Sequence, residues 1–146
     1  FYRTSKEEFA LKTNFNDKVA LLKLFPGMNS ELYKGVFNAS KVDGLILETF
    51  GAGNAPSSKE FRHLIESFIN EGGVILNITQ CNSGSVQQGM YKTSSLFNEL
   101  GVISGADMTT EAAVTKMMAV LDRNDLVKTK KLLAKSLRGE LTEGLK

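Results

Sequence analysis

Several residue types that would have pointed to a particular chemistry are scarce in this chain. Cys81 is its one cysteine, so no internal disulfide can form, and His63 is its one histidine. A zinc site needs several such ligands, so we expect no metal centre. The net charge of +2 is too small to indicate binding of nucleic acid or of an acidic membrane surface. No apolar run approaches the ~20 residues that span a bilayer, so we expect no membrane segment.

The beginning of the chain is polar. Residues 1–8 lack the apolar stretch of a secretory signal peptide, and the first residue is Phe1 rather than Met. We therefore expect residues 1–17 to be the remnant of a linker. Residues 18–146 are enough for one compact domain with a single core, and a composition of 42% hydrophobic and 23% charged residues is ordinary for such a domain.

Three short apolar runs, at 19–25, 44–50 and 74–79, predict strands that are covered on both faces. Each run is followed by a loop containing Gly or Asn and then by a helical pattern. Strands that alternate with helices are typical of a parallel sheet with right-handed crossovers. The sequence therefore predicts a three-layer α/β/α sandwich with a small parallel sheet of about four strands, the fourth near Val102 and Ile103.

Helices are expected at about 30–37, after Pro56, after Thr109 and Thr110, and after Asn124 and Asp125. The helix after Pro56 shows the capping-box spacing of Ser57 and Glu60, and Gly72 and Gly73 end it. The apolar residues expected to face the core are Leu32, Tyr33, Val36 and Phe37 in the first helix, Phe61, Leu64, Ile65, Phe68 and Ile69 in the second, Ala113, Val114, Met117, Met118 and Leu121 in the third, and Leu126, Leu133 and Leu137 in the last.

Ligands of open parallel sheets bind beyond the carboxyl ends of the strands. Three loops lie there, at 26–29, 51–56 and 80–84, and all are rich in glycine or amide residues. Amide side chains can both donate to and accept from a polar substrate, although ordinary tight turns have the same composition. The 51–56 loop is not a dinucleotide-binding loop, because Pro56 replaces the third glycine, and no phosphate-binding loop is present.

No complete catalytic set is visible. Cys81 has no base near it in the sequence, so we expect a small, packed cysteine, and His63 lies on the polar side of its helix. The last helix is basic but has no interleaved aromatic residues, which favours a solvated face over a nucleic-acid surface. The lysines concerned are Lys128, Lys130, Lys131 and Lys135.

At the same loops the chain resembles the C-terminal domain of bacterial L-asparaginases of the cytoplasmic type I branch. The likeness keeps the order and spacing of the family over about residues 19–142, and the G-A-G-N-A-P loop and T-Q-C turn favour type I over the periplasmic type II. The matching segments are residues 19–27, 51–56, 77–81 with Ser83 and Gly84, 105–109 with Glu111 and Ala112, and 137–142.

The resemblance implies a two-domain cytoplasmic amidohydrolase that converts L-asparagine into L-aspartate and ammonia without metal or organic cofactor, as a homodimer or homotetramer. In the family a Thr nucleophile is activated by a second Thr, an Asp and a Lys, all in the N-terminal domain. The T-G-G-T and T-D-T runs that mark these residues are absent here. The resemblance therefore implies that this chain holds no catalytic residue and is inactive alone.

Two residues are implied to bind substrate in a neighbouring subunit's active site. Asn54 corresponds to the Asn of the family's G-x-G-N loop, and Tyr91 lies about where type II enzymes place a second contributor. The alternatives are that Asn54 caps the turn before Pro56 and that Tyr91 packs in the core.

The resemblance also implies an effector pocket for asparagine, at Glu48, Thr79 and Cys81. The best-known pattern has an Arg, which can bind a carboxylate, at the position of Glu48. Glu48 would instead repel a carboxylate. Activation by asparagine is therefore either absent from this protein or uses another group.

Three alternatives to an asparaginase domain stay open. One is the asparaginase-like subunit of a transfer-RNA-dependent amidotransferase, which usually lacks the N-A-P ending and for which the chain shows no basic RNA surface. Another is a non-enzymatic assembly or effector-binding module. The third is an unrelated doubly wound domain such as a response receiver, which would need an acidic cluster where residues 24–27 stand.

Overall fold

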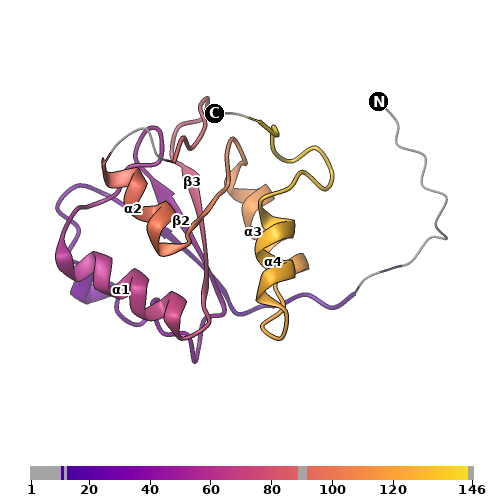
Figure 1. The fold of residues 1–146 in the computed structure, drawn as a ribbon, viewed down its shortest axis with the longest axis horizontal. Helices are drawn as coiled ribbons and strands as arrows, with labels where there is room; N and C mark the ends of the chain where they lie inside the picture. The colour runs from indigo at the N-terminus through magenta and orange to yellow at the C-terminus, as the bar shows by residue number, and fades with distance from the viewer. Residues whose placement is uncertain (1–10, 12, 89–91, 145–146) are drawn as a thin grey trace.

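The computed structural model describes residue 11 and residues 13–88 and 92–144 of the chain. Its centre is a sheet of four parallel strands in the order β1-β2-β3-β4, so each strand lies beside the one before it in sequence (Figure 1). This confirms the predicted small parallel sheet and its weak fourth strand. The strands are β1 Val19–Lys23, β2 Gly44–Thr49, β3 Val74–Thr79 and β4 Ile103–Ser104.

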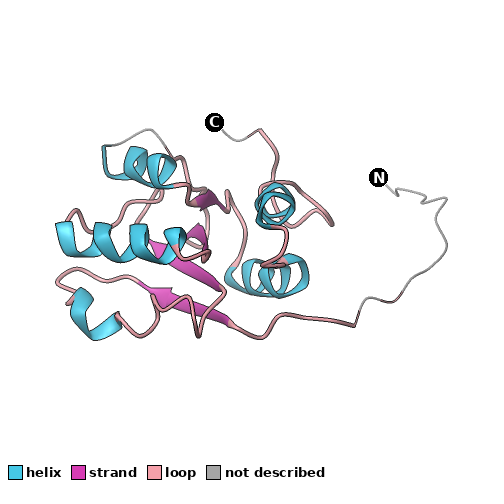
Figure 2. Cartoon of the chain, turned by 60° about the horizontal axis from the view of Figure 1, so that its bottom comes forward, coloured by secondary structure: helices cyan, strands magenta, loops and turns pink. Residues whose placement is uncertain are grey.

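Helices cover both faces of the sheet, which confirms the three-layer architecture (Figure 2). The 3₁₀ helix η1, α1 and α2 lie over one face, and α3 with α4 over the other. The helices are η1 Ser30–Tyr33, α1 Lys59–Asn70, α2 Lys92–Leu100, α3 Thr110–Val120 and α4 Leu126–Leu133. In the described part of the chain, none of these helices has the length and apolarity needed to cross a membrane.

The two central strands divide their side chains between two cores. Leu45 and Leu47 of β2 face α1, whereas Ile46 faces α3, and all six residues of β2 and of β3 are buried. This confirms the prediction that these two runs are covered on both faces. The same prediction is wrong for β1, because β1 is an edge strand and its Leu21 is 44% exposed.

Some helix predictions need correction. The segment at 30–37 forms a single 3₁₀ turn rather than an α-helix, and therefore Leu32 points into solvent and is 78% exposed. The cap of α1 is Ser58, whose Oγ accepts from the backbone N–H of Phe61 at 3.1 Å, and not Ser57. Leu137 lies beyond the end of α4 rather than on it. Helix α2 was not predicted.

Candidate functional site

The 51–56 loop is fastened to the neighbouring strand β3. The Thr79 hydroxyl donates to the Gly51 carbonyl at 2.6 Å, and the Asn77 Nδ2 donates to the Gly53 carbonyl at 3.4 Å. The backbone of Asn54 exchanges hydrogen bonds of 2.8 Å with that of Phe50 in both directions. The loop is therefore a closed turn with its backbone held from three sides.

Gly53 is required inside this turn. Its φ is +104°, a conformation that L residues rarely adopt, and a Cβ there would lie 2.8 Å from Val86 Cγ1. The Asn77 side chain that braces the loop is itself held by Thr49, whose hydroxyl donates to Asn77 Oδ1 at 2.6 Å. Thr49 and Asn77 are fully buried, and a polar pair on neighbouring buried strands is the sequence signal that could have found this brace.

Gln80 ties three strand ends together. It follows β3 directly, and its Nε2 donates to the carbonyls of Leu24, at 2.6 Å, and Glu48, at 2.8 Å. Leu24 follows β1, and Glu48 lies near the end of β2. The carboxyl edge of the sheet is therefore fixed by a side chain as well as by the backbone ladder.

A polar cavity of about 280 Å³ opens at this edge. Glu48, Thr79 and Cys81, which the sequence predicted to share a pocket, all line it. Glu48 is 7% exposed, its Oε1 accepts a short hydrogen bond from the Thr110 hydroxyl, and its Oε2 lies 3.5 Å from Lys23 Nζ. The cavity therefore has a fixed carboxylate on one wall.

The other wall is the loop into α3 and the first turn of that helix. Asp107 lies there, and hydrogen bonds from the side chain and backbone of Thr142 hold its pKa below the ordinary value. The pKa of Glu111 is lowered as well, by its own backbone N–H and by the Thr109 hydroxyl. Together with Glu48, three carboxyl groups line the cavity, and Lys23 is the cation among the lining residues. Sequence reasoning missed Lys23, Asp107 and Glu111 as lining residues, whereas Gln80 belongs to the 80–84 loop that it placed at this edge.

Two of the predicted pocket residues differ in what they can do. The Thr79 hydroxyl donates its proton to the Gly51 carbonyl and accepts from the Cys81 N–H at 3.0 Å. Its proton is therefore already used in a hydrogen bond within the protein. Cys81 is exposed at the cavity, so the expectation of a packed cysteine is wrong. The reason is that Cys81 lies two residues beyond the end of the buried strand β3. Of the residues lining the cavity none is a histidine, and His63 is exposed on α1, as expected.

The predicted substrate residues lie elsewhere. Asn54 is half-buried in the 51–56 loop and does not line the polar cavity, while Tyr91 lies outside the described residues. Among residues 11, 13–88 and 92–144, no group of three or more His, Cys, Asp or Glu is placed to hold a metal ion.

Comparisons with known proteins agree on the family. The model of the glutaminase/asparaginase C-terminal domain matches residues 18–133. L-asparaginase 1 of Escherichia coli is 38% identical over 125 residues, which are 85% of this chain and 37% of that protein. The solved structure of L-asparaginase I from Vibrio cholerae superposes with a TM-score of 0.83 at 32% identity, covering 94% of this chain and 41% of that one.

Relatives with other names are nearly as similar. A subunit of the glutamyl-tRNA(Gln) amidotransferase of Methanopyrus kandleri is 33% identical over 145 residues, 99% of this chain and 31% of that protein. The 60 kDa lysophospholipase of Mus musculus is 35% identical over 139 residues, 94% of this chain and 24% of that protein. The chain thus spans well under half of each of these proteins. It belongs to the asparaginase/glutaminase family and is the C-terminal domain of that family.

Proposed function

We propose that this domain is part of an L-asparaginase, which hydrolyses L-asparagine to L-aspartate and ammonia without a cofactor. The likeness in sequence and fold to type I asparaginases over almost the whole chain carries the proposal. The nucleophilic Thr and the groups that activate it lie outside this chain, in an N-terminal domain that precedes residues 1–17. The protein acts in the cytoplasm as a homodimer or homotetramer, and this chain alone releases no ammonia.

In this proposal Asn54 binds substrate in the active site of a neighbouring subunit. Its loop is closed by the Phe50 backbone and braced by Thr79 and Asn77, so the side chain is presented from a rigid support. A rigid support matters because a binding group that is positioned before the substrate arrives has less entropy to lose. Tyr91 is the second contributor.

The polar cavity is proposed as the effector pocket, with Glu48, Thr79 and Cys81 on its wall. The buried carboxylate of Glu48 favours the ammonium end of an amino-acid effector and disfavours its carboxylate. Lys23, whose side chain is 66% exposed, is the group that can receive that carboxylate. Asparagine would then bind with its ammonium group at Glu48, whereas an Arg at this position would favour its carboxylate there.

An ammonia-release assay with asparagine tests the main proposal. The whole protein encoded by the gene should be active and this chain should not. Asn54→Ala in the whole protein should lower kcat/KM at least ~10-fold, with its melting temperature unchanged, because one oriented hydrogen bond to substrate is lost. Asn98→Ala, at an exposed position on α2 outside the polar cavity, is the matched control. Equal activity in the Asn54 and Asn98 variants would remove Asn54 from the site.

The amidotransferase subunit is the second candidate, because its archaeal relatives match nearly the whole chain at almost the same identity. It predicts that ammonia release requires glutamyl-tRNA and a partner subunit. Activity with free asparagine and no RNA would rule it out. Activity that appears only with charged transfer RNA would replace the asparaginase proposal.

A further inference from the structure

The polar cavity at the carboxyl edge of the sheet has two walls of different chemistry. On one wall Lys23 Nζ lies 3.5 Å from Glu48 Oε2, so a cation and an anion stand side by side. An α-amino acid carries an ammonium group and a carboxylate on one carbon atom, and this pair of charges can receive both. The side chain of such a ligand then faces the opposite wall, whose groups decide which amino acid binds.

The opposite wall presents two ionised carboxylates, those of Asp107 and Glu111. Hydrogen bonds hold the pKa of both groups below the ordinary value, so both are charged at neutral pH. The hydroxyl groups on this wall have already given up their protons, since Thr109 donates to Glu111 and Thr110 donates to Glu48. This wall therefore favours a side chain that donates hydrogen bonds over one that only accepts them.

The start of α3 belongs to the same wall, and the N-terminus of a helix usually attracts a carboxylate. Here its backbone donors are already used. The Glu111 N–H is bound by the carboxylate of its own side chain, and the Ala112 N–H donates to the Thr109 hydroxyl at 3.2 Å. The helix end therefore does little to offset the two carboxylates.

The carboxylate of Asp107 is held in one orientation by Thr142. Its Oδ1 accepts from the Thr142 N–H at 2.7 Å, and its Oδ2 accepts from the Thr142 hydroxyl at 2.6 Å. Met108 and Leu141, the chain neighbours of these two residues, are buried in the same core. A carboxylate has roughly four acceptor positions, so Asp107 is fixed by two hydrogen bonds and can still accept others from a ligand.

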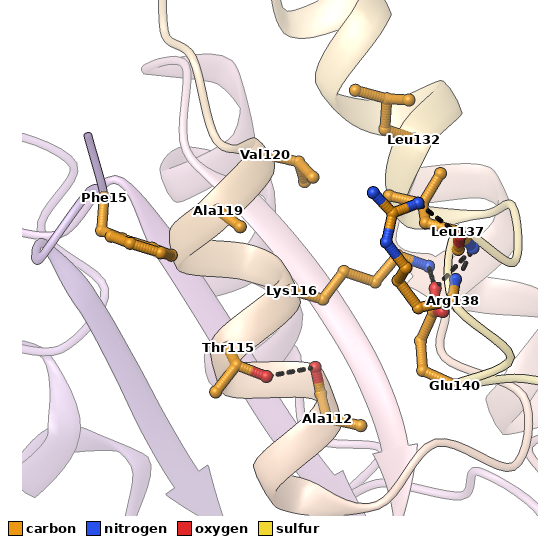
Figure 3. Close-up of a pocket in the computed structure, with 10 residues that line it drawn as sticks. All are labelled: Phe15, Ala112, Thr115, Lys116, Ala119, Val120, Leu132, Leu137, Arg138 and Glu140. Carbon is orange, nitrogen blue, oxygen red and sulfur yellow. Dashed lines mark hydrogen bonds and ion pairs between the residues drawn. The ribbon is translucent and has the colours of Figure 1, made fainter. Parts of the chain in front are cut away.

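The segment that carries Thr142 is itself anchored to α3. The Nζ of Lys116, on α3, lies 2.6 Å from Glu140 Oε1 (Figure 3). The same Nζ donates to the carbonyls of Leu133, at 2.9 Å, and Lys135, at 2.7 Å. The Lys116 side chain is only 4% exposed, so these bonds are made away from solvent. Thr142 is therefore held in place relative to the cavity wall.

We propose that Asp107, oriented by Thr142, makes the polar cavity accept the side-chain amide of asparagine and reject the side-chain carboxylate of aspartate. The inference rests on the proposed effector pocket. The amide nitrogen of asparagine donates to the free acceptor positions of Asp107. Aspartate has no proton to donate there, and its second carboxylate is repelled by Asp107 and Glu111. The pocket then responds to the substrate of the proposed reaction and not to its product.

Protection of the Cys81 thiol measures binding in the cavity, because Cys81 is exposed and lines it. The whole protein encoded by the gene is used, with any cysteine outside this chain changed to Ser. Mass spectrometry follows the reaction of Cys81 with a thiol reagent over the first seconds, before the asparagine is consumed. The dependence of the rate on ligand concentration gives the Kd of each ligand. Aspartate should bind at least ~10-fold more weakly than asparagine.

The variant Asp107→Asn tests the specificity residue itself. An amide has the same shape, can exchange two hydrogen bonds with Thr142 and also offers a donor to a carboxylate. Aspartate should bind at least ~10-fold more tightly to this variant than to the unchanged protein, a gain that a loss of structure cannot produce. Asp122→Asn, at an exposed position outside the cavity, is the matched control and should leave both affinities unchanged.

Thr142 is a positioning residue, and its variants are judged by the ratio of the two Kd values. Thr142→Val keeps the backbone N–H but removes the hydroxyl, so the preference for asparagine over aspartate should fall severalfold. Thr142→Ser restores the hydroxyl and should restore the preference. A ratio that is the same in Thr142→Val as in the unchanged protein would remove Thr142 from the proposal.

The outcomes separate this inference from the proposals on which it rests. Equal Kd values for asparagine and aspartate in the unchanged protein would overturn it and leave the effector pocket in place. A ratio that Asp107→Asn does not change would overturn it as well, because another group would then discriminate. If neither ligand protects Cys81, the effector pocket fails and this inference fails with it. Ammonia release by the same protein tests the asparaginase proposal separately.

Discussion

The Lys116–Glu140 pair gives the sharpest quantitative prediction. Glu140 lies in the segment that follows α4, and it accepts from the backbone N–H groups of Leu137, at 2.9 and 3.1 Å, and Arg138, at 2.6 Å, as well as from Lys116. Partial burial alone would raise the pKa of this carboxyl group. The hydrogen bonds from Lys116 and the two backbone groups outweigh burial and lower it to about 2.

The size of the effect follows from the pKa shift. A shift from 4.5 to about 2 corresponds to a contribution of roughly 3 kcal/mol to the free energy of unfolding at neutral pH. Solvent around the partly exposed Glu140 side chain screens the interaction and reduces this to about 2 kcal/mol. Because the folded pKa is the lower one, the stabilisation is complete above pH ~4.5 and is lost as the pH falls towards ~2. Glu140→Gln keeps the shape, removes the charge and leaves Lys116 buried opposite an amide.

We expect Glu140→Gln to lower the free energy of unfolding by about 2–3 kcal/mol at pH 7, and by much less at pH 2.5. Urea unfolding of the whole protein, followed by circular dichroism at both pH values, measures this. Glu143→Gln is the matched control, since Glu143 is exposed and accepts a single backbone hydrogen bond, from Ser136 at 2.8 Å. It should cost under about 1 kcal/mol. Equal costs for the two variants, or a cost for Glu140→Gln that persists unchanged at pH 2.5, would refute the reasoning.

Three further predictions concern the sheet edge. Gly53→Ala should destabilise the fold by about 2 kcal/mol or more, because it adds a clash with Val86 to an unfavourable φ. Gly27 has a φ of +80° but no atom near its Cβ position, so Gly27→Ala should destabilise the fold by only about 1 kcal/mol. Thermal unfolding distinguishes the two variants. Glu48→Gln should weaken binding of asparagine to the polar cavity several-fold in calorimetry, because the attraction between the Glu48 carboxylate and the ammonium group of asparagine is removed. Unchanged or tighter binding would exclude the proposed orientation. The Cys81 thiol should react with a thiol reagent in the folded protein within ~10-fold of its rate in the unfolded chain, and full protection would contradict its exposure.

The central part of the fold could be predicted because its sequence signal is local. The runs in β2 and β3 are continuously apolar, since both faces of each strand are buried, and Thr109 and Asp125 cap α3 and α4 where the pattern placed them. Helix α2 has no such signal. It includes Thr93, Ser94 and Ser95, and its described links to the core are Phe97, which is 1% exposed, and the partly buried Leu100. Packing rather than helix propensity selects its conformation.

The part of the candidate site that lies at the strand ends could be predicted, because the parallel topology of the sheet decides its position. Because the strands are parallel, Glu48 and Thr79 end up at one edge of the sheet, and Cys81 follows two residues later. The opposite wall could not be predicted from spacing, since Thr110 and Glu48 are 62 residues apart and meet only through the packing of α3 on the sheet. The exposure of Cys81 depends on where the chain turns after β3, which composition alone does not fix.

The open edge of the sheet bears on how this domain behaves when it is produced alone. Within the described part of the chain no strand pairs with the outer side of β1, so its backbone N–H and C=O groups can hydrogen-bond to another chain. The strand is short and nearly all apolar, and Lys23 is its only charge. Such an edge can pair with a strand of another molecule, so the domain produced alone is exposed to edge-to-edge aggregation, and Lys23 is the one charged residue of β1 that opposes it.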